Sequence, residues 1–318
     1  MQKWFAILVV AVALVFATSA AHAQPSLKMM IPANPGGGWD QTGRSLAAAM
    51  QSAKLVSSVQ FDNKGGAGGT IGLAQFVNSS KGDANAVMIG GMVMVGAIYL
   101  ENSPVNLSMV TPLARLTGEY EIIVVPASSP HKTMADLVKA FKANPGGISW
   151  GGGSAGGVDH ITLALIGQAV GVPAAKLNYV AYQGGGEMIA AVAGGKLAAA
   201  ISGASEFKQY VDTGRLRLLA VSSETRLPGV NAPTLKESGV NVVIGNWRGL
   251  VGPPGMSAAG RASMVGMLDK MSKSKTWQDT LKKQGWDDAY LSGDAFGGFL
   301  KEENTRIATV LKEVGLVK

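Results

Sequence analysis

Short apolar runs alternate with segments of helical periodicity along most of the chain. The apolar runs of strand length lie at 27–31, 58–62, 86–91, 121–126, 148–150, 177–182, 197–203, 216–222 and 242–252. The segments that favour helices lie at 40–52, 70–78, 133–143, 158–170, 187–193, 205–212, 257–272 and 295–314. In the last of these, the predicted polar outer face consists of Lys301, Glu302, Glu303 and Arg306. Strands that alternate with helices in this way predict an α/β architecture.

The chain is long for a single hydrophobic core, so we expect two lobes. The strand at 121–126 and the interrupted apolar run at 242–252 are the segments expected to cross between them. The predicted first lobe is 24–125 plus 248–318, and the predicted second lobe is 126–247.

Glycine is clustered at the ends of the predicted strands. The 43 glycines include runs at 36–38, 65–69, 151–153 and 184–186, each after a strand and before a helix. Ligands of open α/β sheets bind at this edge, and the N–H groups of a helix start favour anions. The alternative is that the glycines only form tight turns. Four runs at equivalent positions favour an anion-binding cleft between the lobes.

Composition narrows the possible chemistry. The chain has no cysteine and only three histidines, which excludes disulfides and thiolate metal sites and leaves few metal ligands. Its net charge of +7 is not gathered in a basic run, and aromatic residues make up only 6% of the chain. These features argue against nucleic-acid binding, and no motif indicates a metal or cofactor.

The first 23 residues have the pattern of an export signal. Lys3 precedes the apolar stretch WFAILVVAVALVFA, and AHA at 21–23 is a typical cleavage site. The stretch is short for a membrane span, although an uncleaved anchor is the alternative. We therefore expect an exported protein located in a bacterial periplasm.

Two enzyme motifs overlap in the run 151–156. GGGSAG matches the dinucleotide-binding pattern, but no acidic residue follows at the required distance. GGSAG at 152–156 matches a nucleophile elbow centred on Ser154. The only downstream histidine, His160, lies in the helix that follows directly and is badly placed to act as the base. An exported α/β enzyme that uses Ser154, a hydrolase or transferase, is kept as the alternative function.

Several polar and aromatic residues near the glycine runs have two interpretations each. Asp40 either caps its helix or contacts a ligand, and Arg44 either pairs with Asp40 or binds a carboxylate. Asp159 and His160 are similarly ambiguous. Three aromatic residues either line the cleft or belong to the core: Trp39, Tyr182 and Trp247.

Five segments together resemble a known receptor family. They are PANPGGGWDQTGR (32–44), NKGGAGGTIG (63–72), GGSAGGVDH (152–160), NYVAYQGGGE (178–187) and ISGASEF (201–207). The chain from Leu27 to its end resembles the tripartite tricarboxylate transporter receptors, also called Bug receptors. With IGNWRGLVGPPG (244–255), it is most similar to the branch that includes citrate and tricarboxylate receptors.

The resemblance implies a type II periplasmic binding fold, in which two α/β lobes joined by two crossing strands enclose an organic carboxylate. It also implies delivery to the membrane carrier subunits of a tripartite transporter. The ligand-binding residues that it implies are Gly36, Gly37, Gly38, Trp39, Asp40, Gly66, Ala67, Gly68, Gly69, Ser154, Ala155, Gly156, Gly157, His160, Tyr182, Gly184, Gly185, Ser202 and Ser205. Many family members have a serine where Gly157 stands, so no hydroxyl contact is expected there.

The sequence thus predicts a receptor without catalytic residues. We expect it to bind citrate or another tri- or dicarboxylate by lobe closure, to act as a monomer and to bind no nucleic acid.

Overall fold

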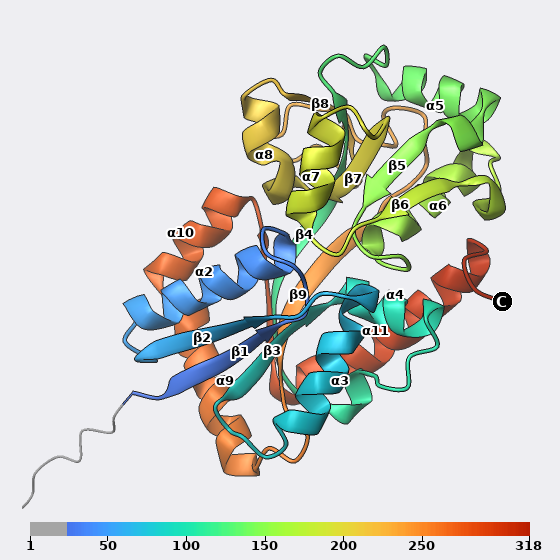
Figure 1. The fold of residues 1–318 in the computed structure, drawn as a ribbon. Helices are drawn as coiled ribbons and strands as arrows, with labels where there is room; N and C mark the ends of the chain where they lie inside the picture. Colours follow the sequence, from blue (N-terminus) through green and yellow to red (C-terminus); the bar gives the residue numbers. More distant parts are fainter. Residues whose placement is uncertain (1–23) are drawn as a thin grey trace, which may run out of the picture.

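The computed structural model describes residues 24–318, and the predicted export signal lies outside this range. These residues form two α/β lobes that are joined by long central strands (Figure 1). The predicted α/β architecture of two lobes is confirmed. Within residues 24–318 no helix is both long and apolar enough to cross a membrane.

The first lobe is built on a mixed sheet with the strand order β2-β1-β3-β9-β4, in which β10 also pairs with β4. Its strands are β1 (Ser26–Ile31), β2 (Ser58–Asn63), β3 (Ala86–Gly91), β4 (Thr111–Pro126), β9 (Gly245–Gly252) and β10 (Asp287–Ser292). Strands β1, β2 and β3 are parallel, whereas β9 runs antiparallel to both β3 and β4. The carboxyl ends of the three parallel strands point toward the second lobe (Figure 1).

The second lobe continues from β4 in the order β4-β7-β5-β6, and β8 also pairs with β4. Its other strands are β5 (Ser149–Gly152), β6 (Asn178–Ala181), β7 (Ala199–Gly203) and β8 (Leu216–Val221). Strand β5 is parallel to both β6 and β7.

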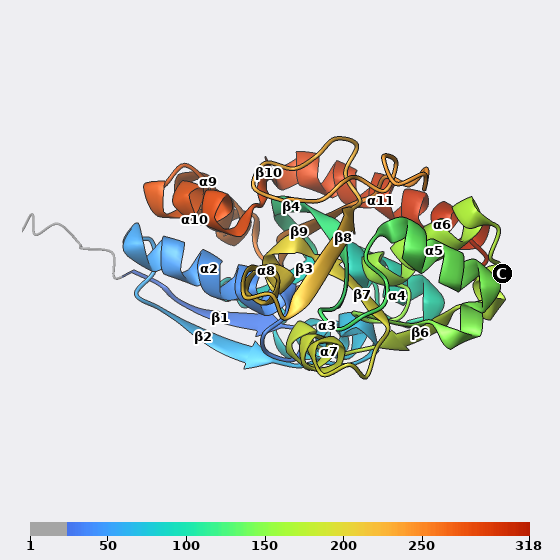
Figure 2. The same cartoon turned by 90° about the horizontal axis from the view of Figure 1, so that it is seen from above.

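Helices cover both sheets (Figure 2). The first lobe has α2 (Gly38–Ser52), α3 (Thr70–Ser79), α4 (Met92–Leu100), α9 (Ala258–Ser272), α10 (Lys275–Gln284) and α11 (Gly293–Glu313). The second lobe has α5 (Met134–Ala143), α6 (Val158–Val170), α7 (Gly185–Ala193) and α8 (Ala204–Asp212). Helix α5 begins with a capping box, because Thr133 Oγ1 accepts from the N–H of Asp136 and Asp136 accepts from the N–H of Thr133.

Most of the predicted helices and strands are present in the structure. Elements that the sequence pattern did not predict were missed for physical reasons. Helix α4 follows β3 directly and is apolar on all sides, so it shows no helical periodicity in the sequence. Helix α10 is mostly polar and buries only Trp277 and Leu281. Strand β4 begins ten residues before the predicted start; this first part contains the half-buried Arg115 and the buried Glu119, which interrupt the apolar pattern.

The predicted outer face of the last helix is wrong at one position. Glu303 is buried, accepts a hydrogen bond from Trp247 Nε1 at 2.8 Å and pairs with Arg306. Trp247 also packs edge-on against Phe296 and Phe299. It therefore belongs to the core of the first lobe and not to a ligand cleft.

The two crossings of the chain between the lobes are tied together at Ser222. Strand β4 changes partners between Tyr120, which pairs with β9, and Glu121, which pairs with β7. Ser222 Oγ accepts from the N–H of Glu121 at 2.9 Å and donates to the carbonyl of Ile244 at 2.6 Å. The lobe boundaries at 125/126 and 247/248 stay a prediction. The first falls within β4 and the second within β9, and these two strands meet at this point.

We expect Ser222→Ala to lower the free energy of unfolding by about 2 kcal/mol or more. The substitution leaves two buried backbone groups without partners, and each costs about 1–3 kcal/mol. Urea unfolding measures the change. Ser79→Ala, which removes an exposed hydroxyl at the end of α3, is the control and should stay within about 0.5 kcal/mol of the parent. Equal effects of the two substitutions would contradict the proposal that Ser222 links the two crossing strands.

Candidate functional site

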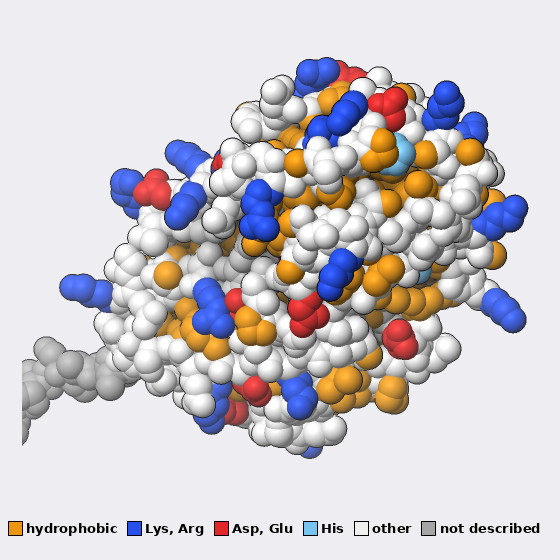
Figure 3. Space-filling model, turned by 45° about the horizontal axis from the view of Figure 1, so that its top comes forward, with side chains coloured by type: hydrophobic (Ala, Val, Ile, Leu, Met, Phe, Trp, Pro, Cys, Tyr) orange, Lys and Arg blue, Asp and Glu red, His pale blue; other side chains and the backbone are white. Residues whose placement is uncertain are grey.

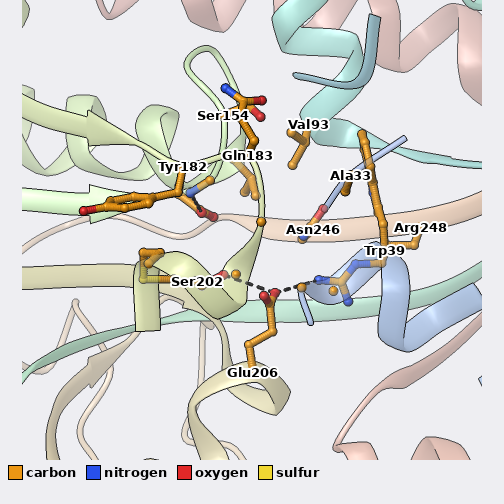
Figure 4. A pocket seen from close by; sticks show the side chains of 18 of the residues that line it. Ala33, Trp39, Val93, Ser154, Tyr182, Gln183, Ser202, Glu206, Asn246 and Arg248 are labelled. Atoms are coloured by element: carbon orange, nitrogen blue, oxygen red, sulfur yellow. Dashed lines mark hydrogen bonds and ion pairs between the residues drawn. The ribbon is translucent and has the colours of Figure 1, made fainter. Parts of the chain in front are cut away.

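A cavity of about 80 Å³ lies between the lobes at the ends of the parallel strands. Both lobes contribute to its wall, as the close-up in Figure 4 shows. The residues that line it are Pro32, Ala33, Gly37, Gly38, Trp39, Val93, Gly153, Ser154, Val158, Asp159, Tyr182, Gln183, Gly184, Gly185, Met188, Ser202, Glu206, Asn246 and Arg248. On the face drawn in Figure 3, Lys and Arg side chains are scattered and do not form one basic patch.

A buried arginine forms the floor of this cavity. Arg248 projects from β9 and is only 3% exposed. Its Nη2 contacts Glu119 of β4 directly and lies 3.3 Å from Oε1 of Glu206 on α8 (Figure 4). One guanidinium thus joins the central strands of the first lobe to a helix of the second lobe.

Hydroxyl groups hold the two glutamates in place. Ser202 Oγ donates to Glu206 Oε1 at 3.1 Å, and Ser205 Oγ donates to Glu119 Oε2 at 3.2 Å. Ser205 in turn accepts from Trp286 Nε1 at 3.1 Å. Buried charges need such partners, because removing them from water is costly otherwise.

Two further buried carboxyl groups lie beside this cluster. Asp159 accepts from the N–H of Gly153, and Glu121 is fully buried with no donor to either oxygen among the described residues. Burial raises the pKa of Asp159 to about 6, although the Gly153 N–H and Glu121 oppose the shift. Burial and the charge of Asp159 raise the pKa of Glu121 well above its ordinary value. Burial also raises the pKa of Glu206 to about 7, against the opposing effect of Arg248.

Two glycines of the predicted loops and Gly203 make room for these charged side chains. A Cβ atom at Gly38 would lie 2.0 Å from Arg248 Nη2, and one at Gly185 would lie 2.3 Å from Glu206 Oε2. A Cβ at Gly203 would lie 2.2 Å from Glu119 Oε1. At these three positions the close neighbour of the glycine is a buried ionisable side chain, and the expected contact of the glycine loops with a ligand stays a prediction.

Four helices begin around the cavity with uncapped N–H groups. The residues before α2, α6, α7 and α8 are all glycines, namely Gly37, Gly157, Gly184 and Gly203, and none has a side chain to cap the helix. Unpaired N–H groups and the helix dipole make each start attractive to an anion. The convergence of four such starts offers donors to an anion from both lobes.

The lobes are in contact across the cavity, so the structure is a closed form. The N–H of Asn34 donates to the carbonyl of Gln183 at 3.1 Å, and Asn34 Nδ2 donates to Glu187 Oε1 at 2.8 Å. Elsewhere, the helix glycine Gly96 packs directly on the carbonyl of Gly156. Asn34 was not predicted as a site residue, although it stands inside the PANPGGGWD segment.

The structure brings some of the predicted site residues to the cavity and not others. Those that line it are Gly37, Gly38, Trp39, Ser154, Tyr182, Gly184, Gly185 and Ser202. Those outside the lining are Gly36, Asp40, Gly66, Ala67, Gly68, Gly69, Ala155, Gly156, Gly157, His160 and Ser205. The segment 66–69 packs instead on Trp39, Met94, Ala97 and the side of Ser154. Contact of any of these residues with a ligand stays a prediction.

Asp40 and Arg44 form a structural pair beside the site. Arg44 Nε donates to both oxygens of Asp40 at 3.0 Å, and Asn63 and the N–H of Gly36 also donate to Asp40. Burial raises the pKa of Asp40, but these hydrogen bonds outweigh it and lower the pKa overall. Asp40 does not cap α2, which has no side-chain cap; it holds the loop before the helix instead, and its contact with a ligand stays a prediction.

His160 also has an intramolecular partner. Its Nδ1 accepts from the N–H of Gly156 at 3.2 Å, and its ring stacks on Tyr179 with centroids 4.3 Å apart. Burial lowers the pKa of His160 to about 4, so the ring is neutral at neutral pH. Because the ring lies outside the cavity lining, it is not placed to activate Ser154.

The sequence reasoning missed the residues that carry charge at the site. Glu206 and Arg248 stand inside the quoted segments ISGASEF and IGNWRGLVGPPG but were not selected. An arginine within an otherwise apolar strand was a usable signal, since a buried guanidinium requires acidic partners. Nothing in the local sequence indicated Glu119 as that partner.

Comparisons with known proteins are consistent with this geometry. The model of the tripartite tricarboxylate transporter family receptor matches residues 43–316. BugT of Bordetella pertussis is 26% identical over 298 residues, covering 91% of this chain and 89% of BugT.

Three solved structures share the fold. The periplasmic binding protein BugD superposes with a TM-score of 0.84 at 23% identity, covering 93% of this chain and 100% of BugD. Rpa4515 of R. palustris, solved with adipate, gives 0.83 at 22% identity, with coverages of 92% and 97%. MatC of Rhodopseudomonas palustris, solved with malate, gives 0.80 at 18% identity, with coverages of 90% and 99%.

We expect Gly38→Ala to destabilise the protein by about 3–5 kcal/mol, because the new methyl group must displace Arg248 from its buried partners. Thermal or urea unfolding measures the loss. Gly266→Ala is the matched control: Gly266 lies inside α9 with nothing within 4 Å of a Cβ, so this change should stabilise by about 0.5–1 kcal/mol. A mild effect of Gly38→Ala would show that the guanidinium is not fixed there.

Proposed function

Because the chain belongs to the tripartite tricarboxylate transporter receptor family, we propose that it captures a small organic carboxylate and delivers it to the membrane carrier subunits of a tripartite transporter. Receptors of this family are periplasmic solute-binding proteins, and this chain is such a receptor and not an enzyme. The alternative of an enzyme that uses Ser154 is therefore set aside.

The observation that carries the proposal is the set of anion donors around one cavity. Four uncapped helix starts surround it, and Arg248 adds an Nη1 group that has no partner among residues 24–318. Donors that face a water-poor cavity are strong sites for a carboxylate. Two proteins of the same fold, MatC and Rpa4515, were solved with malate and adipate, which are both dicarboxylates.

The size of the cavity favours a small ligand. A water-sized group needs about 10–15 Å³ of such volume, so about 80 Å³ accommodates roughly five to eight of them. We therefore propose a four-carbon diacid in preference to citrate, which would require the lobes to close less tightly.

Lobe closure is the proposed mechanism of capture. A ligand that contacts both lobes stabilises the closed form by its differential affinity for that form. The hydrogen bonds of Asn34 to the second lobe exist only when the lobes meet, so they add to this stabilisation. We further propose that the receptor acts as a monomer in the periplasm and arrives there through the signal at 1–23.

A thermal-shift screen of malate, adipate and citrate tests the function. We expect the melting temperature to rise with ligand concentration, with malate the most effective, because a ligand present at 100 times its Kd stabilises by about 2.7 kcal/mol. Sugars and simple cations are the controls. Shifts with those compounds and none with any organic acid would refute the proposal.

We expect Asn34→Ala to weaken carboxylate binding several-fold while leaving the melting temperature of the unliganded protein nearly unchanged. The substitution removes the side-chain hydrogen bond to Glu187, which forms only on closure and is worth about 0.5–1.5 kcal/mol, and it keeps the backbone hydrogen bond to Gln183. Calorimetric titration measures the affinity. Asn304→Ala, which removes a hydrogen bond to Tyr99 within the first lobe, is the control and should bind as the parent does.

A further inference from the structure

The site combines anion donors with an excess of buried acid. Glu119, Glu121, Asp159 and Glu206 lie around a single guanidinium, that of Arg248, and each of the five side chains is more than nine-tenths buried. If all four carboxyl groups were ionised, a carboxylate ligand would enter a water-poor site of net charge −3. Such a site would repel the proposed ligand, so some of these groups must be neutral when it binds.

Contacts within the cluster indicate which groups are ionised. Glu119 contacts Arg248 and accepts from Ser205, so it forms an ion pair. Glu121 has no donor, and a proton on it both removes a bare buried charge and supplies a donor to Asp159. Asp159 also accepts from the Gly153 N–H, which favours its ionised form. Glu206 also accepts from Ser202 and lies 3.3 Å from Arg248, but both contacts use its Oε1, which leaves Oε2 able to carry a proton.

Glu206 is also the carboxyl group best placed to meet the ligand. It lines the cavity from the first turn of α8, and its Oε2 packs against the backbone of Gly185 at the start of α7. An ionised Oε2 would compete with a ligand carboxylate for the N–H groups of that helix start. A protonated Oε2 can instead donate a hydrogen bond to the ligand.

We propose that the receptor takes up its carboxylate ligand together with one proton, which resides on Glu206. Two polar groups in the same wall support a ligand at this place. Arg248 and Asn246 line the cavity with side chains that are more than nine-tenths buried, and Arg248 Nη1 and Asn246 Oδ1 have no partner within the described chain. The proposal rests on the proposed function and specifies the form in which the ligand is held.

The charges around Glu206 bring its pKa into a pH range in which binding can be measured. The ionisable groups that face it are Glu119 and Glu121 from β4, Asp159 from α6 and Arg248 from β9. Burial, together with the charges of Glu119 and Asp159, raises the pKa of Glu206 to about 7 against the opposing effect of Arg248. A bound anion would raise this pKa again, so the affinity should fall as pH rises above 7. His160, with its lowered pKa, stays neutral in this range.

Calorimetric titration of the parent protein with malate and adipate at pH 7, 8 and 9 tests the proposal. The carboxyl groups of both probes stay ionised in this range. We expect the affinity to fall by up to tenfold per pH unit. At pH 8, titrations in two buffers of different protonation enthalpy should show net uptake of close to one proton per ligand.

Glu206→Gln and Asp212→Asn are the matched variants, both on α8. We expect the glutamine variant to keep the same affinity from pH 7 to pH 9 and to bind more tightly than the parent at pH 9. The asparagine variant alters an exposed carboxylate and should retain the pH dependence.

The outcomes separate the two proposals. Binding that is independent of pH refutes the proposal that Glu206 carries the proton but leaves the receptor function intact. Binding that strengthens as pH rises does the same and would indicate a ligand with an ammonium group. Persistent pH dependence in a folded Glu206→Gln variant also refutes the proposal of a proton on Glu206. If that variant does not fold, the proton count of the parent decides. Absence of binding by either probe at every pH overturns both proposals.

Discussion

The buried charge of Arg248 is the constraint on which the cavity depends. Its guanidinium reaches Glu119 on the other crossing strand and Glu206 on the second lobe, so one residue links both parts of the molecule. A buried cation without such partners would be strongly destabilising. The glycines at 38, 185 and 203 follow from this requirement, because any side chain there would collide with one of the three charged groups.

Glycines at the N-cap positions of the helices around the cavity have a further consequence. Since Gly37, Gly184 and Gly203 stand directly before helices, those helices begin without side-chain caps, and their N–H groups are available around the cavity. The arrangement supplies a carboxylate site from backbone alone. It also places that site beside several acids, which is why the protonation state of the wall becomes part of ligand recognition.

Closure between the lobes depends on small residues for a related reason. Gly96 lies directly on the carbonyl of Gly156, and Asn34 reaches across to Gln183 and Glu187. Backbone can approach backbone this closely only where no Cβ intervenes. These contacts join the two lobes beside the cavity.

Local pattern in the sequence determined the order of strands and helices, the two-lobe architecture and the position of the glycine runs at the strand ends, because these depend on periodicity and on backbone freedom. It did not determine helix α4, which is apolar on every side, or the first ten residues of β4, whose charged residues Arg115 and Glu119 look exposed in isolation. The tertiary structure alone decided what each glycine touches. Arg248 and Glu119 are far apart in the chain and are paired only because two crossing strands bring them together, and that pairing gives the site its charge.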